Sequence, residues 1–176
     1  MWGIAGYDPV LSSTANDVFA AHGARLGSLV GRPLTGVCGL AFRIDGSWSH
    51  AGPVILEFDG PCLEVLAEGF DTLYLSWDVI DVTTPITQDD DPELALDWAR
   101  LDLPEIGSAV TGVRILETYV RLTPDDSDPI EAWLLAGLEF VVAPGDRAIQ
   151  LVNALDALRL STEPPASDTW RRRTVN

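Results

Sequence analysis

Histidine is the side chain best suited to acid–base chemistry near neutral pH, and the chain has two histidines. His22 lies on an apolar stripe with helical spacing, which favours a role in the core. His50 follows Trp48 in a stretch that we expect to be a loop between strands, with Asp45 just before it. A Ser–His–Asp triad needs one hydrogen-bonded arrangement that a single loop rarely supplies, and the chain has no G-x-S-x-G motif. His50 is therefore a weak catalytic candidate, and an ordinary exposed histidine is the favoured interpretation.

Aspartates cluster in two places where they could bind calcium or magnesium. Asp89 and Asp90 belong to a run of three aspartates, and Asp125 and Asp126 lie in a loop bounded by prolines. Neither cluster has the glycine and glutamate of an EF-hand loop, and no C-x-x-C or H-E-x-x-H pattern offers a zinc site. The chain also lacks a G-x-G-x-x-G loop and has no lysine for a Walker motif. We therefore expect no metal ion and no cofactor.

Paired carboxylates could in principle hydrolyse a glycoside. Glu64 and Glu68 alternate with Leu63, Val65 and Ala67, so both carboxylates should lie on one side of a strand. This arrangement is typical of solvent-facing strand residues, which is the favoured interpretation.

The charge of the chain is strongly acidic, with a formal net charge of −16, and all eleven basic residues are arginine. Nine acids lie between Asp78 and Glu105, against Arg100 alone. Such a surface repels phosphates and attracts basic proteins, so we expect no nucleic-acid partner and a protein partner of basic character. A merely solubilising face is the alternative. The one basic cluster, Arg171–Arg173 after Trp170, could dock on the acidic segment, or residues 161–176 could form a flexible tail.

The apolar runs are too short for a membrane helix, and the N-terminus has no basic region typical of a signal peptide. The two cysteines, Cys38 and Cys62, fit no redox or zinc spacing and are expected to be reduced, buried thiols. A cytoplasmic location without membrane attachment follows as the expectation.

Hydrophobic periodicity and turn signals predict the elements that position these residues. A capped helix is expected over 14–30, and alternating apolar residues with Asp-Gly turns predict an antiparallel meander over 34–77. Pro92 after a capping aspartate predicts a second helix over 92–102, followed by a second β-rich stretch over 110–152. A short helix is expected over 154–160.

The two β-rich stretches show a weak internal repeat. Residues 31–77 can be laid over 107–153 without a gap, and the shared G-x-x-[L/V]-T-G-V block begins at Gly31 and Gly107. A rival register matches Leu-Glu-Phe at 56–58 with the same triplet at 138–140. We expect an α+β fold of two helix-plus-antiparallel-meander units, a possible duplication, packed as one body. The expected divisions are 1–81, 82–160 and the tail 161–176.

The leading functional expectation is a non-enzymatic binding protein, such as an immunity-type protein or a regulatory adaptor, whose acidic surface docks or masks a basic partner. The first alternative is a small-molecule binder or hydrolase with a cleft between the two units near His50. The second is a structural homo-oligomer, such as a homodimer, joined through a sheet edge. The candidate partner-binding residues are Trp48, His50, Asp89, Asp90, Asp125 and Asp126.

Overall fold

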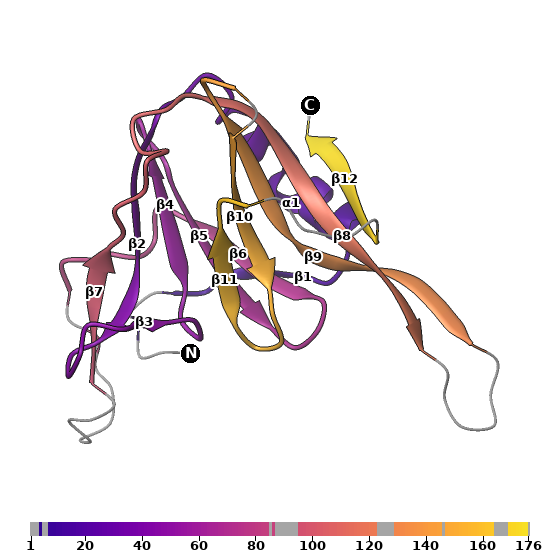
Figure 1. Ribbon diagram of the computed structural model, residues 1–176, viewed down its shortest axis with the longest axis horizontal. Helices are drawn as coiled ribbons and strands as arrows, with labels where there is room; N and C mark the ends of the chain where they lie inside the picture. Colours follow the sequence, from indigo (N-terminus) through magenta and orange to yellow (C-terminus); the bar gives the residue numbers. More distant parts are fainter. Residues whose placement is uncertain are drawn as a thin grey trace.

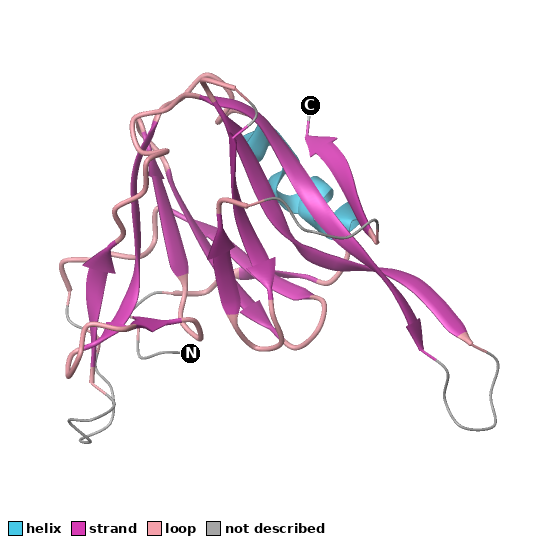
Figure 2. Cartoon of the chain, viewed as in Figure 1, coloured by secondary structure: helices cyan, strands magenta, loops and turns pink. Residues whose placement is uncertain are grey.

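The computed structural model describes residues 4, 7–84, 86, 95–122, 129–145, 147–163 and 169–175. Within them the chain forms two antiparallel sheets and one helix, α1 (Ala15–Gly27) (Figures 1 and 2). The fold is therefore more strongly β than the expected α+β architecture. No helix in the described part of the chain is long and apolar enough to cross a membrane.

The first sheet contains seven strands in the order β1-β6-β5-β4-β2-β3, with β7 on the other edge of β2. Neighbouring strands β2, β4, β5 and β6 form the antiparallel meander that periodicity predicts over 34–77. The strands are β1 (Val10–Ser12), β2 (Leu34–Phe42), β3 (Trp48–Ser49), β4 (Val54–Phe58), β5 (Cys62–Glu68), β6 (Thr72–Trp77) and β7 (Leu96–Arg100).

The second sheet contains five strands in the order β11-β10-β9-β8-β12. Its strands are β8 (Val110–Leu122), β9 (Ile130–Val142), β10 (Arg147–Asn153), β11 (Leu158–Ser161) and β12 (Trp170–Val175). β8 and β9 continue beyond their neighbours as a two-stranded arm (Figure 1). The pairing of β12 with β8 extends no further than Thr118, and the pairing of β10 with β9 extends no further than Gly137. Neither flanking strand therefore accompanies the arm.

The expected helix over 92–102 is wrong for its described part, because residues 96–100 form strand β7. β7 pairs antiparallel with β2, from Cys38 opposite Arg100 to Phe42 opposite Leu96. A free edge of β2 supplies backbone partners, and this tertiary pairing overrides the local helix signal. The second meander is therefore not preceded by a helix in residues 95–109, so the repeated helix-plus-meander unit is not supported.

Two expectations near the C-terminus also need correction. The expected helix over 154–160 is instead a tight turn, closed by the Ala154 amide donating to the Ala157 carbonyl at 2.8 Å, and then β11. The expected flexible tail contains β12, which pairs with β8 along the whole of residues 170–175. Three consecutive arginines concealed this strand, because a strand with polar residues on both sides carries no period-2 signal.

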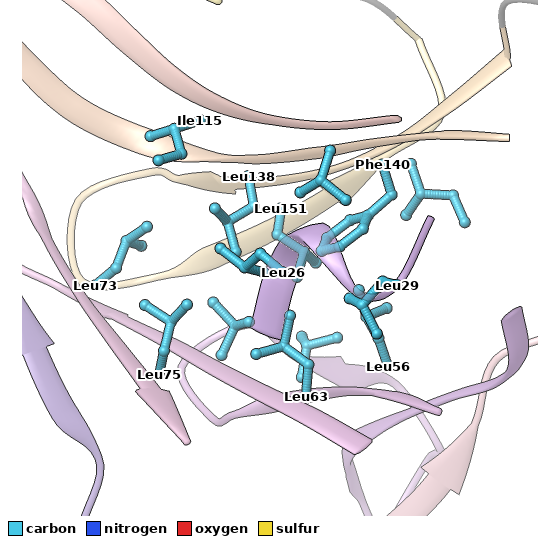
Figure 3. Packing of buried hydrophobic residues seen from close by; sticks show 14 of the residues in the cluster. Leu26, Leu29, Leu56, Leu63, Leu73, Leu75, Ile115, Leu138, Phe140 and Leu151 are labelled. Atoms are coloured by element: carbon cyan, nitrogen blue, oxygen red, sulfur yellow. The ribbon is translucent and has the colours of Figure 1, made fainter. Parts of the chain in front are cut away.

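α1 confirms the expected N-terminal helix, although it is shorter than the predicted range. A capping box fixes its start: the Asp17 amide donates to the Thr14 hydroxyl at 3.2 Å, and the Thr14 amide donates to the Asp17 carboxylate at 2.9 Å. The helix packs against β8 and β12 of the second sheet. In Figure 3, leucines from this helical region and both sheets point toward one another, which makes one continuous core.

The two G-x-x-[L/V]-T-G-V blocks meet each other at one end of the sandwich. The Gly31 amide donates to the Val110 carbonyl at 2.8 Å, and the Gly107 amide donates to the Leu34 carbonyl at 2.7 Å. Each of these bonds is the image of the other under the sequence offset of 76 between Gly31 and Gly107. Both glycines have positive φ, 90° and 89°, which explains why glycine recurs there. We call this pair of segments (31–34 and 107–110) the junction.

The strands that leave the junction also match in register. In the β2–β4 pair a bulge lies between Leu34 and Gly36, and in the β8–β9 pair a bulge lies between Val110 and Gly112. After each bulge, Val37 faces Leu56 and Val113 faces Phe140. The partner strands β4 and β9 therefore correspond at an offset of 84. The register with an offset of 76 holds for the first strand of each meander only, and the rival Leu-Glu-Phe register does not match this pairing.

At the other end of the sandwich, the β5–β6 and β10–β11 turns touch each other. The Gly69 amide donates to the Asp156 carboxylate at 2.5 Å, and the Asn153 amide group donates to the Thr72 carbonyl at 3.2 Å. The backbones of Leu155 and Asp156 have positive φ, as a type I′ hairpin turn requires. Both ends of the sandwich are thus fixed by hydrogen bonds between the two sheets.

Candidate partner-binding surface

The two sequence-predicted binding residues in the β3 region have different environments. The Trp48 ring covers Gly39 on the neighbouring strand, where a Cβ atom would overlap it, so this side chain is half-buried and packs on the sheet. His50 is exposed, and its ring makes no hydrogen bond to any described residue. Its backbone carbonyl accepts from the Leu158 amide at 2.7 Å, so the loop lies where the two sheets meet. Trp48 therefore packs on the sheet with part of its ring exposed, His50 lies where the two sheets meet, and a binding role for both stays a prediction.

The four aspartates predicted to bind a partner, Asp89, Asp90, Asp125 and Asp126, lie outside the described residues. Among the residues that are described, no three histidine, cysteine or acidic side chains are arranged to hold a metal ion. His22, the other histidine, is buried and accepts a hydrogen bond from the Trp77 indole at 3.2 Å. It is thus a core residue, as its place on the apolar stripe predicts.

Both cysteines are free, and the strand order explains why. Cys38 lies on β2 and Cys62 on β5, with β4 between them, so two strand spacings of about 5 Å each separate their backbones. That distance exceeds the roughly 7 Å limit for a disulfide. Burial raises the pKa of Cys38 to about 11, and the nearby Glu57 carboxylate adds to the effect. The thiol is therefore protonated and a poor nucleophile near neutral pH.

Buried glutamates are the feature that strand periodicity does not predict. Glu64, expected to face solvent, is 0% exposed. Its carboxylate accepts from the Ser76 hydroxyl at 2.5 Å and from the amides of Val79 and Ile80 at 2.7 and 3.0 Å. The chain after β6 folds over this face of the sheet, so Glu64 holds that segment in place. Glu68 is exposed, as predicted, so the two carboxylates have different environments.

Glu139 occupies a buried position in the second sheet and is 2% exposed. It accepts from Arg114 at 2.8 Å, from Arg172 at 3.1 Å and from the Gln150 amide group at 2.5 Å. Burial, the largest influence, opposes ionisation, but these hydrogen bonds outweigh it and hold the pKa of Glu139 below its ordinary value. Glu139 is therefore charged near neutral pH, and two guanidinium groups balance that charge.

Glu117 is the second buried carboxylate on this sheet, at 4% exposed. Arg171 of β12 donates to both of its oxygens, at 2.5 and 2.8 Å, and Arg173 approaches to 4.0 Å. The Arg171 guanidinium also lies 4.7 Å from the centre of the Trp133 ring. The basic cluster, for which docking on the acidic connector was one alternative, pairs with Glu117 and Glu139.

These contacts belong to a wider pattern in which most arginines pair with carboxylates of the same chain. Nine of the eleven arginines form ion pairs with the chain's own carboxylates, at Arg25, Arg43, Arg100, Arg114, Arg121, Arg147 and Arg171–Arg173. Arg32 instead donates to the carbonyls of Ser28 and Asp59. Exposed carboxylates without an ion pair to any described residue include Asp8, Asp59, Asp81, Asp102 and Glu163.

The surface therefore presents negative charge that the protein's own cations leave unmatched. The sequence total of −16 already indicates the excess, but it does not reveal which carboxylates the arginines pair with. An acid within an apolar strand, such as Glu139 in Leu138-Glu139-Phe140, was the available signal for the buried pairs. Comparisons with protein-family models, with curated proteins and with solved structures found no match.

Proposed function

We propose that the chain is a non-enzymatic protein-binding module whose acidic surface docks or masks a basic protein partner, as an immunity-type protein or a regulatory adaptor would. One observation carries the proposal: internal ion pairs engage nine of the eleven arginines, while exposed carboxylates stay unpaired among the described residues. Unmatched surface charge of one sign steers an oppositely charged protein and suppresses like-charged partners.

The test is to capture partners on the immobilised chain at low salt, reconstitute each purified complex and measure its Kd by calorimetry. A specific basic partner should bind at least about tenfold more weakly at about 0.5 M salt than at about 0.05 M, because surface charges are screened. A partner of acidic character, or a Kd that ignores ionic strength, would contradict the proposal.

Matched variants separate charge from shape. Asp81→Asn/Asp102→Asn removes two unmatched carboxylates, whereas Asp81→Glu/Asp102→Glu keeps both charges. We expect the amide variant to slow association several-fold and the glutamate variant to leave it unchanged, since steering depends on charge. Equal effects from both variants would show that shape, rather than charge, matters at these positions.

A homo-oligomer is a second candidate, and β1 is the feature that favours it. This three-residue edge strand exposes Val10 and Leu11, at 49% and 53%, beside a backbone edge that pairs with no strand in the described part of the chain. Such edges can pair with a second copy. Light scattering over a concentration series tests it, and a Leu11→Lys variant should abolish any dimer without unfolding the chain.

We further infer that the two meanders descend from one duplicated β unit without the helix. The reciprocal bonds at the junction, the two Thr-Gly bulges and the matching strand order support this inference. Relatives that carry a single meander and assemble as symmetric dimers through the Gly31-type block would be the expected finding. Relatives in which only one half contains the block and the bulge would count against it.

A further inference from the structure

The C-terminal strand β12 brings the chain's one basic cluster onto a sheet edge beside two buried glutamates, Glu117 and Glu139. β12 pairs antiparallel with β8, and the register sets Arg171 opposite Glu117, Arg172 opposite Leu116 and Arg173 opposite Ile115. Backbone pairing of this kind accepts most sequences, so any selectivity must come from side chains on the two faces of the sheet.

On one face, Glu117 is the acceptor. Arg171 binds it through two hydrogen bonds of 2.5 and 2.8 Å, and it also lies over the Trp133 ring. Arg173 lies over the Phe19 ring at 4.8 Å and donates to Asn16 of α1 at 2.9 Å. All ion-pair partners of Glu117 among the described residues come from β12. The charge of this buried carboxylate is therefore balanced by the strand alone.

On the opposite face, Arg172 donates to both oxygens of Glu139 at 3.1 Å. Three consecutive arginines are thus matched on alternating faces, with a carboxylate on each face and aromatic rings on one of them. The apolar anchor of the strand is Val175, which joins the core at 5% exposed. Besides the backbone pairing with β8, the arginines of β12 make charge pairs, a hydrogen bond to Asn16 and cation–π contacts. Salt weakens the charge pairs, and another arginine can reproduce all of these contacts.

We infer that this edge of β8 is a recognition site for an extended segment with three consecutive arginines, and that β12 occupies it in cis until a basic partner segment replaces it. The inference rests on the proposed function for the basic character of the partner, and it adds the surface and the mode of binding. Because β12 is tethered, its effective concentration reaches the millimolar range, so a partner must compete with it. β12 therefore masks the site and sets a threshold for binding.

The direct test uses a fluorescent peptide with the sequence of residues 169–175, added to the full-length chain and followed by anisotropy. In the variant Arg171→Ala/Arg173→Ala the tethered strand is weakened, so we expect the peptide to bind at least about tenfold more tightly than to the unmodified chain. Adding Glu117→Gln to that variant should reverse the gain. A peptide with glutamine in place of the three arginines is the matched control, and it should not bind.

A second variant guards against loss of the fold. Arg171→Lys/Arg173→Lys keeps both charges but loses the two-pronged hydrogen bonding of the guanidinium, so it should loosen β12 more gently. Where either variant melts cooperatively yet fails to bind the peptide, the inference is overturned. If neither variant folds, NMR of the unmodified chain with excess peptide decides: shifts at the amides of Val113–Thr118 support the site, and their absence overturns it.

The outcomes for the inference and for the proposed function are distinguishable. If a basic partner binds with a salt-sensitive Kd that Glu117→Gln does not change, the proposed function is retained and the recognition site on β8 is excluded. Peptide binding without any salt-sensitive basic protein partner leaves the site and removes the function. A dimer in which two copies exchange β12 would assign the site to a second copy and overturn the partner version.

Discussion

The two meanders share a backbone register, but equivalent rows across their outer faces differ in chemistry. In the first sheet the row contains one buried carboxylate, which neutral donors satisfy. In the second sheet the row contains a carboxylate balanced by two guanidinium groups, one of which comes from the distant strand β12. The rows are Cys38, Ile55, Glu64 and Ser76 in the first sheet and Arg114, Glu139, Gln150 and Ser161 in the second.

This difference separates the backbone features that both meanders require from the side-chain contacts that are specific to each. The junction and the bulge that follows it recur because the backbone requires them. Apart from the serines Ser76 and Ser161, the polar groups of the rows do not recur. Glu64 accepts from the amides of Val79 and Ile80 and so fixes the segment that follows β6. Glu139 depends on Arg172, so its charge is balanced in full only while β12 is in place. The predictions below test this comparison from the largest effect to the smallest.

Gly137, which faces a further bulge of the β8–β9 pair between Leu116 and Glu117, should be the least replaceable glycine. At Gly137 a Cβ atom would overlap the Leu151 carbonyl of the neighbouring strand, whereas at Gly112 nothing lies within 4 Å of that position. We expect Gly137→Ala to lower the free energy of unfolding by about 3 kcal/mol and Gly112→Ala to lower it far less. Urea denaturation of both variants measures the contrast, and equal midpoints would contradict it.

The buried glutamates of the two rows, Glu64 and Glu139, should respond differently to loss of charge. Glu139→Gln removes a partner of two half-exposed arginines and should cost about 2 kcal/mol, whereas Glu64→Gln keeps an acceptor for the Val79 and Ile80 amides and should cost about 1 kcal/mol. Chemical denaturation at low and high salt gives both values. A larger loss at Glu64 would show that local amides, rather than guanidinium groups, dominate.

Glu139 also predicts a dependence of stability on pH. The pKa of Glu139 is lowered in the folded state, so its stabilising effect is complete above the ordinary value of ~4.3 and is lost as the pH falls through the lowered folded value. The stability difference between the unmodified chain and Glu139→Gln should therefore shrink below about pH 4. A difference that stays constant from neutral pH into this range would contradict the assignment.

The junction predicts equality rather than contrast. Gly31 and Gly107 both have positive φ, and at neither position would an added Cβ meet another atom within 4 Å, so the cost of alanine is conformational in both cases. Gly31→Ala and Gly107→Ala should each lower the free energy of unfolding by about 1 kcal/mol. Thermal unfolding of the two single variants suffices, and a clear inequality would break the correspondence.

The smallest expected effect concerns α1, the helix that precedes the first meander and has no counterpart before the second meander among the described residues. Burial, with a smaller contribution from Arg25, lowers the pKa of His22. Its stabilising effect is therefore complete above the unfolded value of ~6.5 and declines as the pH falls toward the lowered folded value. We expect the unmodified chain to lose up to about 1 kcal/mol more than His22→Asn between about pH 7.5 and 5.5. Parallel pH profiles would exclude His22 as the cause.

Local signals in the sequence were sufficient for much of the first half. The capping box at Thr14 and the Asp-Gly turn at Asp59 mark element ends, and alternation located β5 and β6. The repeated Thr-Gly-Val block was also recognisable, although its partner strands were aligned wrongly, because the connections between the first two strands of each meander differ in length. Alignment without gaps cannot represent such a difference.

Pairing between residues far apart in the sequence could not be predicted from local patterns. Residues 96–100 have a local helix signal, and only the open edge of β2 makes them a strand. Arg171–Arg173 resemble a tail in the sequence because their partners, Glu117 and Glu139, lie more than thirty residues away. The sequence also gives no sign that Trp48 is half-buried, because the space for its ring comes from Gly39 on an adjacent strand.

The junction also constrains how this chain folds. Hydrogen bonds between Gly31 and Val110, and between Gly107 and Leu34, close a loop of more than seventy residues, so they can form only after most of the chain has been synthesised. The first meander would therefore leave the ribosome with its leading backbone groups unpaired. Because the two sets of bonds need each other, the amides of Gly31 and Gly107 should exchange with solvent together, in the slowest class of the molecule.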